Sequence, residues 1–244
     1  GGNYIEKMDV PRVLDRLIAR KAIPPVIAVF SEPVTGFADS QIAVVSGPNL
    51  ALEIAQGQPA ASVAASTSKT SAEIVAKAAS NGYFTTFINK DVIGTEFGGI
   101  LKNLIAVAIG IVNGVGYGEN TKASIMTRGL AEISRFAVAY GAKATTMVGL
   151  AGLGDLIATS ESPLSRNHKA GEMLGKGYTL REVLRRMSQT AEGLSSVAPI
   201  LQLAKAKDVS MPIVEQVQLV LEGKMDPKDI APHLTTETDG PQGE

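Results

Sequence analysis

The sequence predicts an α/β portion followed by a larger all-helical portion, with the boundary near Asp91. Between residues 41 and 89, short β-branched apolar runs alternate with helical segments, an order typical of a parallel or mixed sheet. No strand pattern follows, and one helical segment succeeds another. We therefore expect two domains, residues 1–90 and 91–234, and a disordered polar tail over residues 235–244.

Three strands are expected in the α/β portion. The run IAVVSG is β-branched and ends in Gly47, which predicts a strand buried on both faces. Further strands are expected at residues 61–66 and 83–89, with helices at 48–57 and 68–82 between the three. Within residues 1–40 the pattern supports only a short amphipathic helix, residues 10–22.

The helical portion is predicted from apolar periodicity and from start and stop signals. Thr179 and Glu182 have the spacing of a capping box, and Met211-Pro212 marks a helix start. Helices are expected at residues 91–112, 122–140, 144–150, 166–175, 179–187, 195–207 and 212–221.

Composition and charge exclude several classes of function. The chain has 244 residues, of which 45% are hydrophobic, so it can bury a sizeable core. Its net charge of -1 and the absence of a basic cluster argue against nucleic acid as a partner. Without cysteine there is no disulfide, thiolate metal site or cysteine nucleophile. His168 and His233, the only histidines, lie in no metal or triad motif, so we expect no metal.

A cytoplasmic location without a membrane partner is the expectation from the apolar segments. The apolar run at residues 104–112 is too short to cross a bilayer. The N-terminal residues carry charges throughout and have no apolar segment of the secretory kind.

The longest apolar run begins directly after a polar pair, Lys102 and Asn103. A helix this apolar must be buried around most of its circumference, so the ammonium must be paired, reach a surface or lose its proton. Gly98 and Gly99 lie one turn earlier on the same face and would leave a hollow beside the amine. A lysine reaching solvent from a core helix, with glycines for close packing, explains this stretch equally well.

Asp155 is the only charged residue of the segment AGLGDLIAT. A carboxylate in such surroundings requires a cation, and Lys102 is the obvious candidate. An N-cap role after Gly154 is an equal alternative. Thr159 would share the face of Asp155 if the helix continues.

Ser165-Arg166-Asn167 opens a helical stretch after Pro163. A serine N-cap, free amides and an arginine fork form an anion site that suits phosphate, although an ordinary cap followed by solvated charges is the simpler interpretation. For Glu192, in TAEG, a surface glutamate at a turn is an equally good explanation.

Together these segments resemble the bacterial-type NAD(P)-dependent glycerol-3-phosphate dehydrogenase family. The resemblance covers most of residues 41–225, through SGPNLALEIA, GTEFGGILKNLIAVAIGIVNGVGYGEN, TRGLAEISR, GLAGLGDLIAT, SRNHKAGEMLGKG and TAEGLSSV. It implies a partial Rossmann-like sheet packed on a larger helical C-terminal domain. It also implies a cytoplasmic homodimer that interconverts sn-glycerol 3-phosphate and dihydroxyacetone phosphate with NAD or NADP, for phospholipid synthesis.

The resemblance also assigns roles to particular residues. Lys102 matches the general acid/base. The substrate-binding positions correspond to Gly47, Asn49, Lys102, Asn103, Asp155, Thr159, Ser165, Arg166 and Asn167, and the dinucleotide-binding positions to Ala51, Arg166, Thr190 and Glu192. The glycine hollow before Lys102 would admit the flat nicotinamide.

Two features of the family are missing. There is no G-x-G-x-x-G/A turn to hold a pyrophosphate, and no Thr-Lys-Gly segment with a second pocket lysine before SGP. Residues 1–40 show no convincing resemblance to the family's N-terminal region. We therefore expect an N-terminally incomplete member that binds a dinucleotide poorly or not at all, with an open sheet edge.

Two alternatives remain from the sequence. One is a hydroxy-acid dehydrogenase of similar layout, against which Ser165-Arg166-Asn167 argues. The other is a catalytically silent helical module for oligomerisation or binding, which the missing glycine turn favours.

Overall fold

The computed structural model describes residues 43–187 and 191–231. Its sheet has the order β1 (Val44–Ser46), β2 (Ala60–Ala65) and β3 (Phe84–Asn89). β2 pairs in parallel with β3 and antiparallel with β1, so the sheet is mixed, one of the two arrangements that the sequence predicts. The helix expected at residues 10–22 and the tail expected at 235–244 lie outside the described residues.

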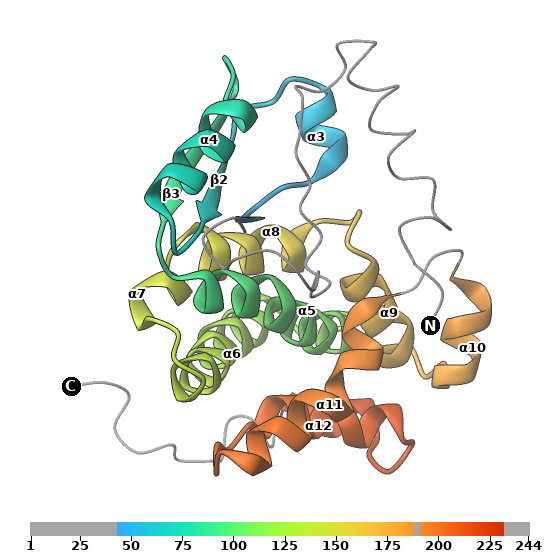
Figure 1. Cartoon of the computed structure of the whole chain (residues 1–244). Coiled ribbons are helices and arrows are strands. Elements are labelled where there is room, and N and C mark those ends of the chain that lie inside the picture. Colours follow the sequence, from blue (N-terminus) through green and yellow to red (C-terminus); the bar gives the residue numbers. More distant parts are fainter. Residues whose placement is uncertain (1–42, 188–190, 232–244) are drawn as a thin grey trace.

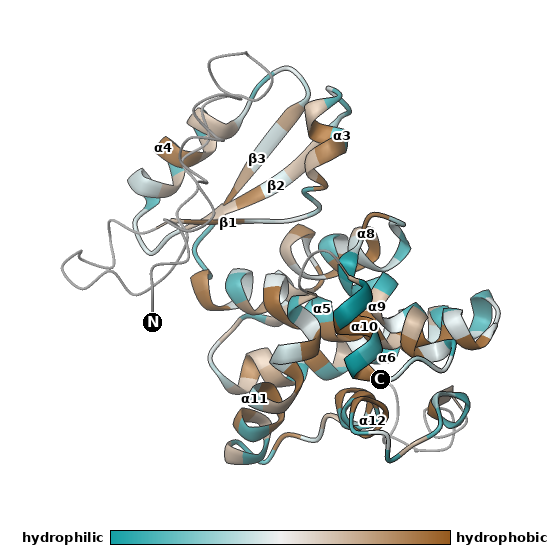
Figure 2. Cartoon of the chain, turned by 90° about the vertical axis from the view of Figure 1, so that its right-hand side faces the viewer, coloured by the Kyte–Doolittle hydropathy of each residue, from teal (hydrophilic) through white to brown (hydrophobic). Residues whose placement is uncertain are grey.

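β1 differs from the prediction. All three of its residues are half-buried, so the expectation of a strand buried on both faces is wrong. The reason is its position at the edge of the described sheet, where it pairs with β2 and contacts helix α5 (Val92–Val115). Helices α3 (Ala51–Ala55) and α4 (Lys69–Ala79) lie with the sheet at one end of the molecule, and α4 packs on β2 and β3 (Figure 2).

Helix α5 is the centre of the helical part, where the other helices surround it (Figure 1). Asp91 caps its start by accepting a hydrogen bond from the Gly94 N–H at 2.9 Å, and Gly116 ends it with a φ of 97°. Every residue from 104 to 112 is buried, as the apolar run predicts. Among the described residues α5 is also the one helix long and apolar enough to cross a membrane, so the short apolar run does not by itself exclude a span. Its burial by neighbouring helices is typical of a core helix.

The remaining helices follow α5 in the sequence. Those predicted at 166–175 and 212–221 have the observed bounds, and the other boundaries move by at most three residues. A π-helical turn and a separate helix α8 lie around Asp155, which is in none of the helices expected from the sequence. The elements are α6 (Glu119–Ala139), α7 (Ala144–Met147), η2 (Leu150–Gly154), α8 (Asp155–Glu161), α9 (Arg166–Gly175), α10 (Leu180–Arg186), α11 (Glu192–Ala206), α12 (Pro212–Leu221) and η3 (Pro227–Asp229).

Glycines bring α5 and α9 into direct backbone contact. A Cβ at Gly110 would overlap the His168 carbonyl oxygen, and one at Gly171 would overlap that of Val107. Such close approach is possible only without side chains, and it fixes the height of α9 along α5. The start of α9 is thereby held beside the polar residues of α5.

Candidate active site

Lys102 is paired with Asp155 at the centre of the site. The Lys102 Nζ lies 2.5 Å from Asp155 Oδ2, and the two side chains are 17% and 6% exposed. Thr159 Oγ1 donates a hydrogen bond to Asp155 Oδ1 at 3.3 Å, so Thr159 shares the face of Asp155 as predicted. The N-cap of α8 is Gly154, and the Asp155 carboxylate makes no cap hydrogen bond. The capping-aspartate alternative is therefore wrong, whereas Lys102 is held by an ion pair and keeps a minor part of its side chain exposed.

The charge state of Asp155 is set by opposing effects. Burial raises the pKa of the Asp155 carboxyl above its ordinary value, and the Lys102 ammonium and the Thr159 hydroxyl offset part of that increase. A buried carboxylate held against an amine at hydrogen-bond distance can stabilise the ammonium while leaving it close to the site. The pair is thus suited to proton transfer at a neighbouring oxygen.

The two glycines before Lys102 have different surroundings. A Cβ at Gly98 would overlap the Ala151 carbonyl oxygen, because the π-helical turn packs directly on α5 there. The hollow expected at Gly98 is therefore filled by backbone, and that glycine serves close packing. At Gly99, a Cβ would lie 3.0 Å from Ser46 Oγ, so the end of β1 covers α5 there, and Gly99 is half-buried.

The loop after β1 lies over the ion pair. Ser46 faces Gly99 on α5, and Pro48 Cδ would be 3.7 Å from a Cβ at Gly154, the residue before Asp155. Ser62 Oγ donates to the Ser46 carbonyl at 2.9 Å, which fixes the end of β1 on β2.

Gly47 and Asn49, both predicted to line the substrate pocket, belong to this loop. Gly47 has a φ of 148°, a conformation that favours glycine, and Asn49 Nδ2 donates to Ser62 Oγ at 3.0 Å. The loop that carries these positions thus contacts the residues near Lys102 and Asp155 in the chain, Gly99 and Gly154.

A second polar chain joins three helices. Asn167 Nδ2 donates to Asn103 Oδ1 at 2.9 Å, and Asn167 Oδ1 accepts from the Gly193 N–H at 2.9 Å. Asn103 Nδ2 in turn donates to the Gly99 carbonyl at 3.3 Å. Asn103 and Asn167 are therefore fixed relative to each other at the start of α9.

Ser165 and Arg166 open helix α9. Ser165 Oγ accepts a hydrogen bond from the His168 N–H at 3.2 Å, so the side chain is an N-cap, as the simpler interpretation holds. Arg166 is exposed and forms no ion pair with any residue that the structure describes. An exposed arginine beside a helix N-terminus remains available to an anion.

The positions predicted to touch the dinucleotide are dispersed. Ala51 is exposed at the start of α3, and Glu192 is exposed at the start of α11, next to Gly193 and hence close to Asn167. Thr190 lies outside the described residues.

Comparison with known proteins identifies the family. A family model described as NAD-dependent glycerol-3-phosphate dehydrogenase C-terminus matches residues 91–232. The chain belongs to the NAD-dependent glycerol-3-phosphate dehydrogenase family. The model of the N-terminus of the same family matches residues 18–72, so the likeness extends further toward the N-terminus than the motifs from residue 41 onward indicate.

Relatives and solved structures support the same conclusion. A glycerol-3-phosphate dehydrogenase (NAD(P)+) from Leifsonia xyli is 69% identical over 204 residues, which are 84% of this chain and 55% of the relative. One from Frankia casuarinae is 52% identical over 86% of this chain and 62% of the relative. The chain thus spans somewhat more than half the length of these relatives.

The fold is shared with solved structures of related proteins. The glycerol-3-phosphate dehydrogenase of Coxiella burnetii matches with a TM-score of 0.77 and 36% identity, over 80% of this chain and 60% of that one. The structure of the Dunaliella salina protein DsGPDH matches with a TM-score of 0.73 and 26% identity, over 82% of this chain and 36% of that one. The sheet is accordingly the partial Rossmann-like sheet expected, packed on a larger helical domain.

Sequence reasoning missed the burial of Glu132 on α6. It is 1% exposed and accepts hydrogen bonds from the N–H groups of Ile213 at 2.9 Å and Val214 at 3.1 Å. The sequence does contain a signal, because Glu132 follows Gly129 by three residues and precedes Phe136 by four, both on the buried face of α6.

Proposed function

We propose that this chain supplies the substrate-binding and proton-transfer part of an oxidoreductase that interconverts sn-glycerol 3-phosphate and dihydroxyacetone phosphate with NAD or NADP. The observation that carries the proposal is the buried pair of Lys102 and Asp155, which lies beneath the Gly47 loop and beside the start of α9. Family membership and the names of the relatives support the same reaction.

Lys102 acts as the general acid/base in this proposal. Reduction of the ketone requires a proton at the substrate oxygen, and oxidation of the alcohol requires its removal. The Lys102 ammonium can donate that proton, while Asp155, which accepts a hydrogen bond from Thr159, stabilises the charge of the ammonium. The dinucleotide supplies or accepts the hydride when it is bound.

The neighbouring polar groups bind and orient the substrate. Arg166 and the first amides of α9 take the phosphate, where the fork of the guanidinium can form two parallel hydrogen bonds. Asn103 and Asn167 orient the hydroxyl groups, and Gly47 and Asn49 close the pocket from the side of the sheet. For the dinucleotide, Ala51, Arg166, Thr190 and Glu192 are the proposed contacts, and the nicotinamide is proposed to lie beside Gly99, next to Ser46.

The organisation of the whole protein is proposed on the same basis. Residues 1–90 form the dinucleotide-binding part and residues 91–234 the substrate part, because the described sheet ends at Asn89 and the core helix begins at Val92. We further propose a cytoplasmic homodimer that serves phospholipid synthesis, as the family resemblance implies.

A chimera tests the reaction. This chain would replace the matching part of the Leifsonia xyli relative, and NADH oxidation would be followed with dihydroxyacetone phosphate and, separately, with 3-keto acids. We expect turnover of dihydroxyacetone phosphate and its loss in the Lys102→Ala chimera. A folded chimera that binds NADH but turns over only the keto acids, or nothing, would overturn the proposal. The same assay on the 244-residue chain alone measures what it does by itself.

A further inference from the structure

Asn103 on α5, Asn167 on α9 and Gly193 on α11 are joined by hydrogen bonds, and we call these three residues the amide link. Each member of the amide link directly follows a residue with a proposed role in the reaction. These residues are the proton donor, the arginine proposed for the phosphate and the carboxylate proposed for the dinucleotide, namely Lys102, Arg166 and Glu192. The amide link therefore connects three proposed contacts that belong to three different helices.

Backbone groups at the two ends of the amide link fix its direction. A backbone N–H can only donate, so the Gly193 N–H makes Asn167 Oδ1 the acceptor at 2.9 Å. Asn167 Nδ2 then donates to Asn103 Oδ1 at 2.9 Å. At the other end, Asn103 Nδ2 donates at 3.3 Å to the Gly99 carbonyl, which can only accept. Both side-chain amides are thus held in one orientation.

Helix α11 has no side-chain cap of its own. Its N-cap residue is Ala191, which has no polar side-chain atom. The Gly193 N–H is one of the first amides of the helix, and such amides have no partner within the helix. Asn167, which is 8% exposed, supplies the acceptor from α9 to this buried glycine. A hydrogen bond of this kind fixes the start of a helix, where Glu192 is the first residue.

The missing side chain of Gly193 lets the start of α11 rest directly on α5 and α9. A Cβ at Gly193 would lie 2.8 Å from the Asn103 carbonyl oxygen and 2.9 Å from Asn167 Oδ1. Both separations are too short for a carbon atom in a packed interior, so a larger residue would displace the start of α11. The position of Glu192 therefore depends on this contact as well as on the hydrogen bond.

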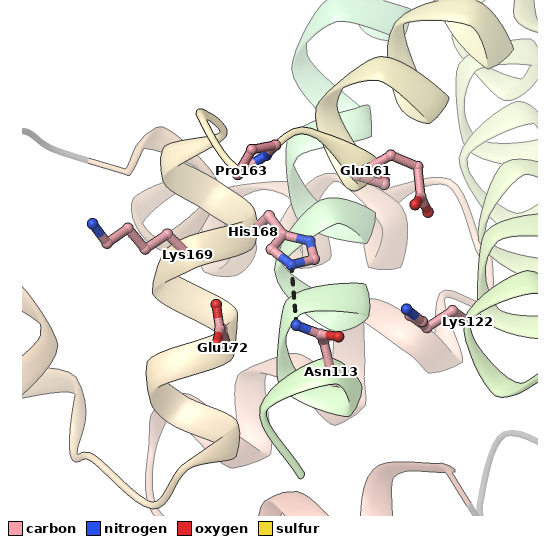
Figure 3. Close-up of a pocket in the computed structure, with 8 residues that line it drawn as sticks. Asn113, Lys122, Glu161, Pro163, His168, Lys169 and Glu172 are labelled. Atoms are coloured by element: carbon pink, nitrogen blue, oxygen red, sulfur yellow. Dashed lines mark hydrogen bonds between the residues drawn. The ribbon is translucent and has the colours of Figure 1, made fainter. Parts of the chain in front are cut away.

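Asn167 can hold α11 in place because α9 is itself fixed on α5. No other pair of described elements packs as extensively as these two helices. Figure 3 shows the ring of His168, the residue after Asn167, beside Asn113 of α5, with His168 Nε2 and Asn113 Nδ2 3.5 Å apart. Removal of the Asn167 amide should therefore release the start of α11 and leave α9 where it is.

We propose that Asn167 is a positioning residue for the dinucleotide, which acts through the Gly193 amide on Glu192. This inference rests on the proposed function, in which Glu192 is a dinucleotide contact. Glu192 is exposed, and its carboxylate can accept hydrogen bonds from the hydroxyl groups of a ribose. The two polar atoms of the Asn167 amide then have separate effects. Oδ1 sets the dinucleotide affinity through α11, whereas Nδ2 holds Asn103 in place beside the proton donor.

Hydrogen exchange of the 244-residue chain, measured by NMR, tests the contact without any ligand. In Asn167→Ala, the Gly193 amide should exchange about fivefold faster, the effect of one lost hydrogen bond. Asn167→Asp keeps an acceptor at the same place, so the exchange rate of this amide should stay close to that of the wild type. An unchanged rate in Asn167→Ala would overturn the proposal at its first step.

NADH titration of the chimera, followed by fluorescence without substrate, tests the effect on the dinucleotide. The NADH dissociation constant should rise about fivefold in Asn167→Ala and in Gly193→Ala, which disturb the same contact from its two sides. In Asn167→Asp, NADH affinity should stay near normal, while KM for dihydroxyacetone phosphate rises because the Nδ2 donor is lost. Thr179→Ala is the matched control, since it removes the side chain that caps α10. This control should lower the melting temperature and leave the NADH dissociation constant unchanged.

Three results of the titration would overturn the proposal. They are an unchanged NADH dissociation constant in Asn167→Ala, a rise of the same size in Asn167→Asp or Thr179→Ala, and a wild-type chimera that binds no NADH. A wild-type chimera that binds NADH but turns over only keto acids, or nothing, rejects the proposed reaction instead. The NADH dissociation constants of the variants still decide the role of Asn167 in that case, so the two proposals fail on different measurements.

Discussion

Two buried carboxylates, Asp155 and Glu132, are held in opposite ways. Asp155 faces a cation, the Lys102 ammonium, which remains 17% exposed and borders the proposed substrate site. Glu132 accepts two backbone N–H groups at the start of α12 and is 1% exposed. Charge compensation by a partly exposed amine leaves one carboxylate next to the site proposed for proton transfer. Compensation by fixed amides makes the other a structural cap.

The cap provided by Glu132 comes from another helix. The N-cap position of α12 is Met211, which has no side-chain oxygen, and Pro212 follows it. Helix amides without such a partner are costly when buried, and Glu132 of α6 supplies both acceptors. Burial raises the pKa of Glu132 to about 7, while the two amides and Arg135 lower it. Asp155 and Glu132 are buried to a similar extent. The comparison therefore indicates that the partner of each carboxylate, an ammonium or backbone amides, determines whether its proposed role is chemical or structural.

The largest expected effect is that of Lys102→Ala on catalysis. In the chimera, kcat with dihydroxyacetone phosphate should fall by roughly 10² to 10⁴, the contribution of one general acid/base. The variant should fold, because α5 keeps its other buried contacts. Steady-state kinetics with circular dichroism as the folding control measures both. A near-normal kcat would show that the pair with Asp155 is merely structural and would remove the contrast with Glu132.

Glu132→Ala should be the most destabilising of these changes and the least relevant to chemistry. It leaves the Ile213 and Val214 amides buried without an acceptor, at about 1–3 kcal/mol each, so the free energy of unfolding should fall by about 4 kcal/mol. Urea unfolding of the chain measures this. Glu73→Ala, on the exposed face of α4, serves as the control and should change stability by less than about 0.5 kcal/mol. If the free energy of unfolding falls by less than about 1 kcal/mol in Glu132→Ala, the Ile213 and Val214 amides form hydrogen bonds with water in the variant.

The next largest expected effect is the contribution of Glu132 to the pH dependence of the free energy of unfolding. Its folded pKa of about 7 lies above the ordinary value of 4.5, so the native state retains a proton that the unfolded chain loses between these values. The stability that Glu132 contributes is therefore fully present below about pH 4.5 and decreases as pH rises to about 7, by about 3 kcal/mol in total. Urea unfolding of the wild type and of Glu132→Gln from pH 4 to 8 isolates this effect, since other groups titrate alike in both. If the free energies of unfolding of the wild type and of Glu132→Gln change with pH in parallel, this prediction is wrong.

Isolated polar residues in apolar segments were the part of the site that the sequence could predict. Asp155 stood alone in an apolar segment and Lys102 preceded one, so their pairing could be predicted as one of the alternatives, and the structure contains it. The bounds of α9 and α12 followed as well, because Ser165 and Pro212 are local start signals.

Features that depend on long-range packing could not be predicted in the same way. The filling of Gly98 by Ala151, the cap from Glu132 to α12 and the hydrogen bond from the Gly193 N–H to Asn167 each join segments far apart in the chain. Local sequence shows that a glycine lacks a side chain or that a glutamate needs donors, but it does not show which backbone approaches. The half-burial of β1 has the same origin, since its composition does not reveal that it lies at the edge of the described sheet.

The smallest expected effect, that of Arg166→Lys, extends the comparison to an exposed charge. The substitution keeps the charge but replaces a planar fork with a point ammonium, so one charge-assisted hydrogen bond to the substrate phosphate is lost. KM for dihydroxyacetone phosphate in the chimera should rise about tenfold, or about 1.4 kcal/mol, with kcat little changed. Arg166 is exposed, so stability should stay within about 0.5 kcal/mol, unlike that of Glu132→Ala. Arg185→Lys on α10, another exposed arginine, is the matched control. An unchanged KM in Arg166→Lys would identify Arg166 as a solvated helix residue and would move the substrate phosphate to another set of donors.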